Sequence, residues 1–126
     1  MIAIDTSLMV DYLRGTPDAL AWLKAQGDEE LALPGPVVLE LLQGCRDKPE
    51  MRRLHSELVR RFRVIWPTTQ DLERALEHYV QTMPEGGFEV MDLLIGETAA
   101  GLGIPLCTLN TRHLSNVPGV EVLKPY

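Results

Sequence analysis

Short apolar runs alternate with longer amphipathic segments along this chain. The runs that predict buried strands are residues 2–4, 31–33, 63–67, 104–109 and 120–122. Between these runs, apolar residues recur every three or four positions, which is the period of a helix with one buried face. The pattern predicts four or five short strands separated by helices.

Helix start and stop signals divide the amphipathic segments. The helices are expected over 7–14, from Pro17 to before Gly27, from Pro36 or Val37 to Gly44, over 50–61, from a cap at Thr68 or Thr69, and over about 90–102. Gly15 and Gly27 suit helix C-termini. The residues expected to face inward are Leu20, Trp22 and Leu23 in the second helix and Met51, Leu54, Leu58 and Val59 in the helix 50–61. Residues 84–87 are expected to form a flexible loop.

Strands that are separated by helices need crossover connections. They therefore predict an α/β fold with a mostly parallel sheet that is flanked by helices on both faces. A chain of 126 residues fits one domain, residues 1–126. Ligands of such sheets bind at the carboxyl ends of the strands, and Asp5 directly follows the first predicted strand.

Composition limits the class of protein to which the chain can belong. Apolar residues make up 45% of the chain, and every apolar run is shorter than a membrane helix requires. No basic leader is expected at the N-terminus, so the sequence predicts a cytoplasmic protein. The two cysteines and three histidines lack metal-ligand spacing, and Cys107 is expected to be a small core residue.

The charge distribution leaves two interpretations open. A net charge of −6 argues against simple electrostatic binding of nucleic acid. Residues 46–74 nevertheless contain eight Lys or Arg and five acids, and nine of the twelve cations in the chain are arginine. These side chains form either a solvated, ion-paired helix face or contacts with phosphate groups.

Three carboxylates stand at the edges of predicted buried elements: Asp5, Glu40 and Asp92. Each has an ordinary explanation. Asp5, or Thr6 beside it, caps a helix, and Asp92 complements a helix dipole in the first turn. Glu40 is the one charged residue between Glu30 and Arg46, and it points either to solvent beside Gln43 or inward.

Convergence of the three acids would require a compensating charge. Two carboxylates about 4 Å apart repel by about 4 kcal/mol at an effective dielectric constant of 20. A shared proton or a divalent cation relieves this repulsion. Glu97 lies five residues after Asp92. It therefore projects about 140° away around the helix and is expected outside such a site.

Four further motifs accompany these acids in a recognisable order. They are Asp5 to Gly15 (DTSLMVDYLRG), Asp92 to Gly96 (DLLIG), Thr108 to Leu114 (TLNTRHL) and Val117 to Val120 (VPGV). Together with Glu40 they resemble a PIN-domain ribonuclease of the VapC toxin family, over essentially the full length. The resemblance implies an endoribonuclease dependent on Mg²⁺ or Mn²⁺, the toxin of a type II toxin–antitoxin pair.

The same resemblance implies roles for individual residues. Asp5, Glu40 and Asp92 match the catalytic, metal-binding acids, whose ion activates a water for attack on RNA. Ser7, Asn110, Arg112 and His113 match positions that bind substrate or orient water. Asn110 stands where many PIN domains carry a further acid, which favours one metal ion, or a second ion bound only with substrate. A homodimer and a VapB-like antitoxin, whose tail enters the acidic cleft, are the implied partners.

Two other functions compete with this interpretation. A PIN-like module that binds RNA or a partner without cleavage stays open, because the further acid is missing. A phosphoacceptor receiver domain needs an Asp after the third strand and a Lys after the fifth. Here Trp66-Pro67-Thr68 follows the third predicted strand and Lys124 lies beside Pro125, so the receiver pattern fails at its reactive positions.

Overall fold

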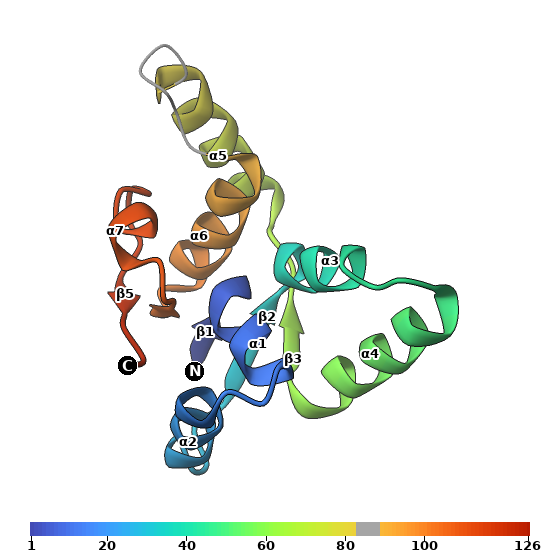
Figure 1. Cartoon of the computed structure of the whole chain (residues 1–126). Helices are drawn as coiled ribbons and strands as arrows, with labels where there is room; N and C mark the ends of the chain where they lie inside the picture. The colour runs from blue at the N-terminus through green and yellow to red at the C-terminus, as the bar shows by residue number, and fades with distance from the viewer. Residues whose placement is uncertain (83–88) are drawn as a thin grey trace.

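A parallel five-stranded sheet forms the centre of the protein. The computed structural model describes residues 1–82 and 89–126. The strands are β1 (Ile2–Ile4), β2 (Leu31–Pro34), β3 (Arg63–Ile65), β4 (Leu106–Cys107) and β5 (Val122–Leu123), and all adjacent pairs are parallel (Figure 1). The spatial order is β3-β2-β1-β4-β5, so the strand order reverses between β1 and β4. The predicted α/β class is confirmed.

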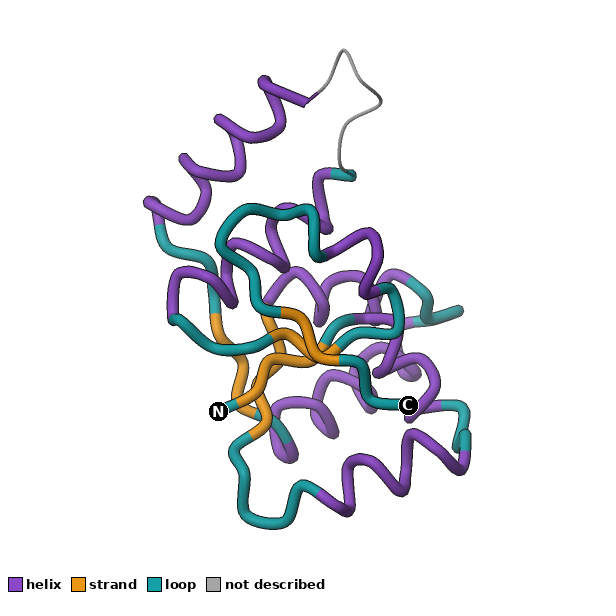
Figure 2. Tube along the Cα trace, turned by 90° about the vertical axis from the view of Figure 1, so that its left-hand side faces the viewer, coloured by secondary structure: helices purple, strands orange, loops and turns teal. Residues whose placement is uncertain are grey.

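Helices lie above and below the strands in Figure 2. They are α1 (Thr6–Leu13), α2 (Pro17–Ala25), α3 (Gly35–Gln43), α4 (Lys48–Arg61), α5 (Thr69–Thr82), α6 (Val90–Leu102) and the short α7 (Thr111–Leu114). The first six correspond to the predicted helices, whereas α7 was not predicted. The loop expected at 84–87 falls outside the described residues.

Strand pairing shortens two of the predicted strands and shifts a third. The run 63–67 ends its strand at Ile65, because Pro34, the last residue of β2, pairs with Ile65. The runs 104–109 and 120–122 become β4 and β5, which pair Leu106 with Val122 and Cys107 with Leu123. Each strand extends only as far as its neighbour offers hydrogen-bonding partners.

Three predicted inward positions are wrong. Leu20, Met51 and Val59 are 45%, 39% and 49% exposed. Each helix turns only a narrow stripe to the sheet. On α4 the predicted inward residue Leu58 is buried, whereas on α2 the buried position is Ala19, which was not predicted.

Small residues let α6 pack closely against the C-terminal segment. A Cβ atom added to Gly96 would lie 2.9 Å from Val117 Cγ1, so a larger residue would force the two apart. Cys107 is fully buried, as expected of a core residue. Across residues 1–82 and 89–126, every helix is too short or too polar to cross a membrane.

Candidate functional site

The three carboxylates meet in one polar pocket beside the point where the strand order reverses. The pocket has a volume of about 280 Å³ and is lined by Asp5, Thr6, Ser7, Glu40, Glu89, Asp92, Asn110 and His113. Asp5 follows β1, Glu40 comes from α3, and Asp92 lies in the first turn of α6. Parallel sheets place their ligand sites at such reversals, because the loops diverge there and leave a crevice.

Asp5 occupies the N-cap position of α1, but its side chain does not cap the helix. No capping hydrogen bond is formed, so the capping explanation for Asp5 is wrong. Its Oδ2 instead accepts hydrogen bonds from Ser7 Oγ at 3.0 Å and Thr108 Oγ1 at 2.6 Å. Within the described residues no group donates to Oδ1, which leaves that oxygen available for a ligand.

The two hydroxyl groups that hold Asp5 are held in turn by the backbone after β4. The backbone N–H of Leu109 donates to Ser7 Oγ at 3.1 Å, and that of Asn110 donates to Thr108 Oγ1 at 2.9 Å. Each hydroxyl group thus accepts from a backbone N–H and donates its own hydrogen to Asp5 Oδ2. The carboxylate is oriented by residues that lie about a hundred positions away in sequence.

Thr108 was not assigned a role from the sequence. Its side chain is fully buried at the end of β4, where a hydroxyl group needs a polar partner. A threonine at the carboxyl end of a predicted buried strand is the signal that would have identified it.

Glu40 turns inward rather than to solvent. The side chain is half-buried, and Oε1 accepts a hydrogen bond from Thr6 Oγ1 at 2.7 Å. Of the two interpretations that the sequence left open, the structure favours the inward one. Thr6 therefore serves as a donor to the second acid, not as a cap.

Burial and the neighbouring acids both disfavour the charged form of Asp92, and burial has the larger effect. Burial raises the pKa of its carboxyl group, His113 opposes this shift, and Asp5, Glu89 and Glu40 raise the pKa further. His113 Nδ1 lies 3.0 Å from Asp92 Oδ2. Glu89 was missed by sequence reasoning, although its position three residues before Asp92 places it next to the same helix end.

The remaining predicted site residues divide into two groups. Asn110 and His113 lie at the pocket, with Asn110 Nδ2 3.3 Å from His113 Nδ1. Arg112 is exposed and does not line the pocket, although its carbonyl oxygen accepts hydrogen bonds from Ser115 and Asn116. The structure therefore brings together every predicted site residue except Arg112.

The pocket offers oxygen ligands, which hard divalent cations prefer. Among the residues that the structure describes, no three His, Cys, Asp or Glu side chains form a group that could hold a metal ion. Mg²⁺ does not require such a cage, since it usually binds one or two carboxylates and keeps several water ligands. The carboxylate, hydroxyl and amide oxygens that line the pocket fit a hydrated cation.

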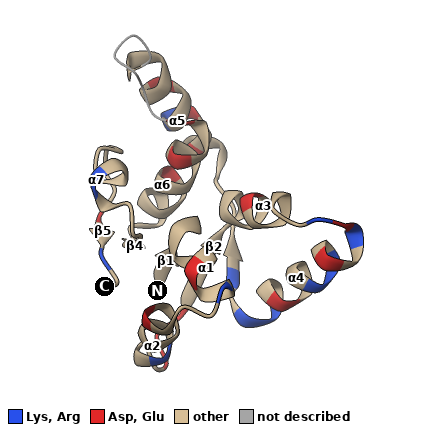
Figure 3. Cartoon of the chain, in the orientation of Figure 1, with Lys and Arg blue, Asp and Glu red and all other residues tan. Residues whose placement is uncertain are grey.

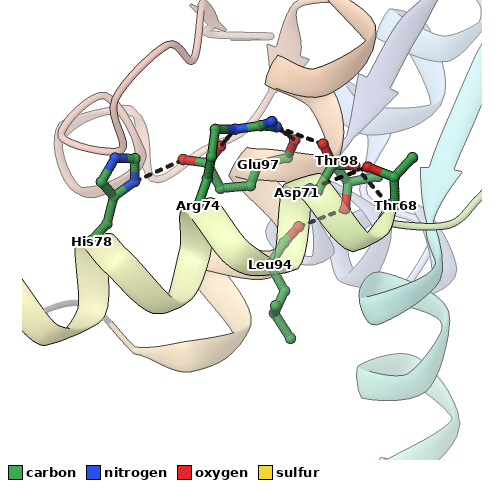
Figure 4. A network of polar contacts seen from close by, with 7 residues as sticks. All are labelled: Thr68, Asp71, Arg74, His78, Leu94, Glu97 and Thr98. Carbon is green, nitrogen blue, oxygen red and sulfur yellow. Dashed lines mark hydrogen bonds and ion pairs between the residues drawn. The ribbon is translucent and has the colours of Figure 1, made fainter.

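Glu97 lies outside the pocket, as the helix geometry predicted. It is 1% exposed and belongs to a charged network between α5 and α6 (Figure 4). Arg74 Nε donates to Glu97 Oε2 at 2.8 Å, and Arg74 Nη2 donates to Asp71 Oδ1 at 2.5 Å. His78 Nδ1 lies 3.0 Å from Glu97 Oε1, but the two atoms do not have hydrogen-bond geometry.

Asp71 also completes the N-cap of α5. Thr68 Oγ1 accepts from the Asp71 N–H at 3.1 Å, and Asp71 Oδ2 accepts from the Thr68 N–H at 2.8 Å. Of the two predicted caps, Thr68 is the one that forms. The network thus ties the start of α5 to the middle of α6, the helix that carries Asp92.

Comparison with known proteins agrees with this architecture. The PIN domain family model matches residues 2–120. The Mycobacterium tuberculosis protein named Ribonuclease VapC19 is 32% identical over 126 residues, covering 96% of this chain and 98% of the relative. Ribonuclease VapC10 of the same species is 33% identical, covering 99% and 92%.

Solved structures share the fold at lower identity. The toxin–antitoxin complex VapBC2 from Rickettsia felis, bound to promoter DNA, superposes with a TM-score of 0.82 at 18% identity, covering 98% of both chains. VapBC-1 from nontypeable Haemophilus influenzae superposes with a TM-score of 0.82 at 20% identity, covering 99% of this chain and 98% of the other. With the family model spanning most of the sequence, and with two relatives above 30% identity over nearly its full length, this chain belongs to the PIN-domain family, among the VapC proteins.

Proposed function

We propose that the protein is a divalent-metal-dependent endoribonuclease and the toxin of a type II toxin–antitoxin pair. The observation that carries this proposal is the meeting of Asp5, Glu40 and Asp92 in one pocket, although they come from three separate elements. Full-length relatives named as ribonucleases support RNA as the substrate.

In this proposal each acid has a distinct task. Asp5 and Asp92 would hold a Mg²⁺ or Mn²⁺ ion, and Asp5 Oδ1 is available for this because it receives no hydrogen bond from the described residues. When bound, the ion would supply a water of lowered pKa and offset the negative charge of the phosphate group. Glu40, oriented through Oε1 by Thr6, would accept at Oε2 the proton of the water that attacks phosphorus. The P–O bond to the leaving ribose oxygen breaks in the same reaction, and that oxygen takes up a proton from solvent. Ser7 and Thr108 keep the Asp5 carboxylate in one orientation.

Asn110 and His113 are proposed to contact the RNA at the entrance of the pocket. Both carry nitrogen donors on the C-terminal side of β4, beside Asp92. Arg112 lies on the same short helix α7 and is proposed to contact a neighbouring phosphate outside the pocket. Arginine suits this task because its guanidinium group binds phosphate oxygens in pairs.

The proposed partner is a VapB-like antitoxin. The structural neighbours include toxin–antitoxin complexes, from Rickettsia felis and Haemophilus influenzae among others. The acidic pocket of this chain attracts a cationic side chain, so an arginine of the antitoxin would compete there with the metal ion and the RNA.

The experiment that tests the proposed activity uses protein freed of any antitoxin. We expect it to cut single-stranded RNA when Mg²⁺ or Mn²⁺ is added, to stop in excess EDTA, and to recover when the metal is restored. Products are resolved on denaturing gels. Folded protein that binds RNA but releases no fragments with either metal would instead support the non-cleaving module.

A homodimer is also proposed, and an apolar surface on α5 and α6 supports it. Leu72, Leu76 and Val80 follow each other at four-residue intervals on α5 and are 45%, 64% and 65% exposed. A hollow of about 250 Å³ beside them is lined by Leu72, Ala75, Leu76, Tyr79, Val90, Leu93 and Leu94. Contiguous apolar surface of this kind marks protein interfaces.

Leu76→Glu is expected to convert a dimer into a monomer, because it places a charge in the middle of this surface. Size-exclusion chromatography with light scattering measures the mass. Gln81→Glu adds the same charge near the exposed end of α5 and should leave the dimer intact. A wild-type protein that is monomeric at every concentration would contradict the proposed homodimer.

A further inference from the structure

The outward face of α4 concentrates positive charge on an acidic protein. The helix contains five Lys or Arg and two Glu, whereas the chain as a whole has a net charge of −6. Figure 3 shows the cations along α4 and in the connection that leads into it. Arg52, Arg53, Ser56 and Arg60 form what we call the α4 arginine face, and all four residues are exposed.

The arginines of this face do not stabilise the fold through polar contacts with the described residues. Within residues 1–82 and 89–126, Arg52, Arg53 and Arg60 make no ion pair and no hydrogen bond. Other arginines nearby are paired: Arg46 with Glu50 and Arg63 with Glu30. An ion-paired surface therefore does not describe these three residues.

Their spacing makes a continuous binding surface. Arg52, Ser56 and Arg60 lie four residues apart, so they form one stripe that rises about 6 Å at each step. Arg53 flanks the stripe. These side chains border a shallow hollow of about 380 Å³ whose lining is Arg52, Arg53, Ser56, Glu57 and Arg60.

We propose that the α4 arginine face binds the phosphate backbone of RNA, as a contact region separate from the acidic pocket. This proposal rests on the proposed function in taking RNA as the substrate. The pocket contributes several carboxylates that repel a polyanion, so much of the attraction for RNA has to come from elsewhere on the surface.

The lining of the hollow favours RNA over an acidic protein segment. Protein partners usually bind through buried apolar or aromatic anchors. The hollow contains no such side chain. A phosphate backbone needs only positive charge and hydrogen-bond donors, which three guanidinium groups and the Ser56 hydroxyl group provide.

Glu57 is the one acid that lines the hollow, and it allows a second, independent test of the proposal. Its carboxylate makes no ion pair within 4.0 Å among the described residues. If phosphate groups occupy the hollow, Glu57 opposes them. Removal of its charge should therefore strengthen binding, an effect that damage to the fold cannot produce.

The test measures binding of a fluorescent single-stranded RNA by anisotropy, in EDTA and in an Asp5→Asn background that does not cleave. The variant Arg52→Gln/Arg53→Gln/Arg60→Gln should bind about tenfold more weakly at low salt. The slope of log K against log salt should fall by about 2, since each phosphate contact on a single strand contributes about 0.7. Glu57→Gln should bind more tightly than its parent.

The matched control is Arg14→Gln/Lys24→Gln/Lys124→Gln, which removes the same charge from exposed residues outside α4. Equal affinity and equal salt slope in the two triple variants would overturn the proposal. So would a polyglutamate peptide that displaces the RNA and binds the face more tightly, because the partner would then be an acidic protein segment.

A cleavage assay separates this proposal from the proposed function. In the wild-type background, the α4 triple variant should raise KM for a long RNA and leave kcat unchanged. If the arginine substitutions do not change cleavage, only the α4 proposal is contradicted. If RNA binding depends on these arginines but the protein never cleaves RNA, only the proposed activity is contradicted.

Discussion

Asp5→Asn is expected to lower RNA cleavage by about 1,000-fold or more, because it removes a charged oxygen from the proposed metal ligands. Asparagine has the same shape and keeps an oxygen that accepts from Ser7 and Thr108. The fold should therefore persist, which circular dichroism checks. The initial rate of RNA cleavage at saturating Mg²⁺ is the measurement.

Asp28→Asn is the control for this variant, since Asp28 is an exposed residue in the turn after α2. It should retain full activity. If Asp5→Asn also kept wild-type activity, the pocket would not be the catalytic centre.

Asp92→Asn should lose activity to a similar degree but should also raise the melting temperature in EDTA. Burial and the acids around it raise the pKa of Asp92 above the ordinary value of an aspartate. The native state therefore holds the proton more tightly than the unfolded chain, and stability falls as pH rises from the ordinary pKa through the raised one. The variant should lose this pH dependence. It also loses the electrostatic attraction between Asp92 and His113, which offsets part of the gain in melting temperature. Thermal unfolding across acidic pH measures both effects.

Arg74→Met is expected to cause the largest loss of stability, about 3 kcal/mol. The substitution leaves Glu97 and Asp71, whose side chains are 1% and 5% exposed, without their cationic partner. The value lies at the lower end of the range for broken buried pairs, because Arg74 itself is 39% exposed and water screens part of the interaction. Urea unfolding followed by circular dichroism measures the free energy.

Arg63→Met provides the comparison for the Arg74 variant. It breaks the exposed pair between Arg63 and Glu30, at 3.0 Å, and should cost less than about 1 kcal/mol. Adding Glu97→Gln to Arg74→Met should recover part of the lost stability, because the uncompensated charge is removed. Equal losses in the two arginine variants would show that the network between α5 and α6 does not stabilise the fold.

Local patterns in the sequence were sufficient for the order of helices and strands. Apolar periodicity located the six longer helices, and the α/β class followed from their alternation with short apolar runs. The position of Asp5 at the end of a strand could also be predicted. These features depend on residues that are close in the sequence, so their spacing is known without the structure.

Other features depended on partners elsewhere in the chain. The predictions for α2 and α4 were wrong at Leu20, Met51 and Val59. The apolar period locates a helix face, but it does not show which part of that face the rest of the protein covers. The lengths of β4 and β5 depended on each other's hydrogen-bonding edges.

The sequence by itself determined which acids were available, and their resemblance to a VapC pattern singled out Asp5, Glu40 and Asp92. Only the tertiary structure decided how they are held: Asp5 by Ser7 and Thr108, Glu40 by Thr6. It also decided that Glu97 pairs with Arg74 across two helices. Such contacts join residues up to 103 positions apart, and they exist only after the strands have paired in the order β3-β2-β1-β4-β5.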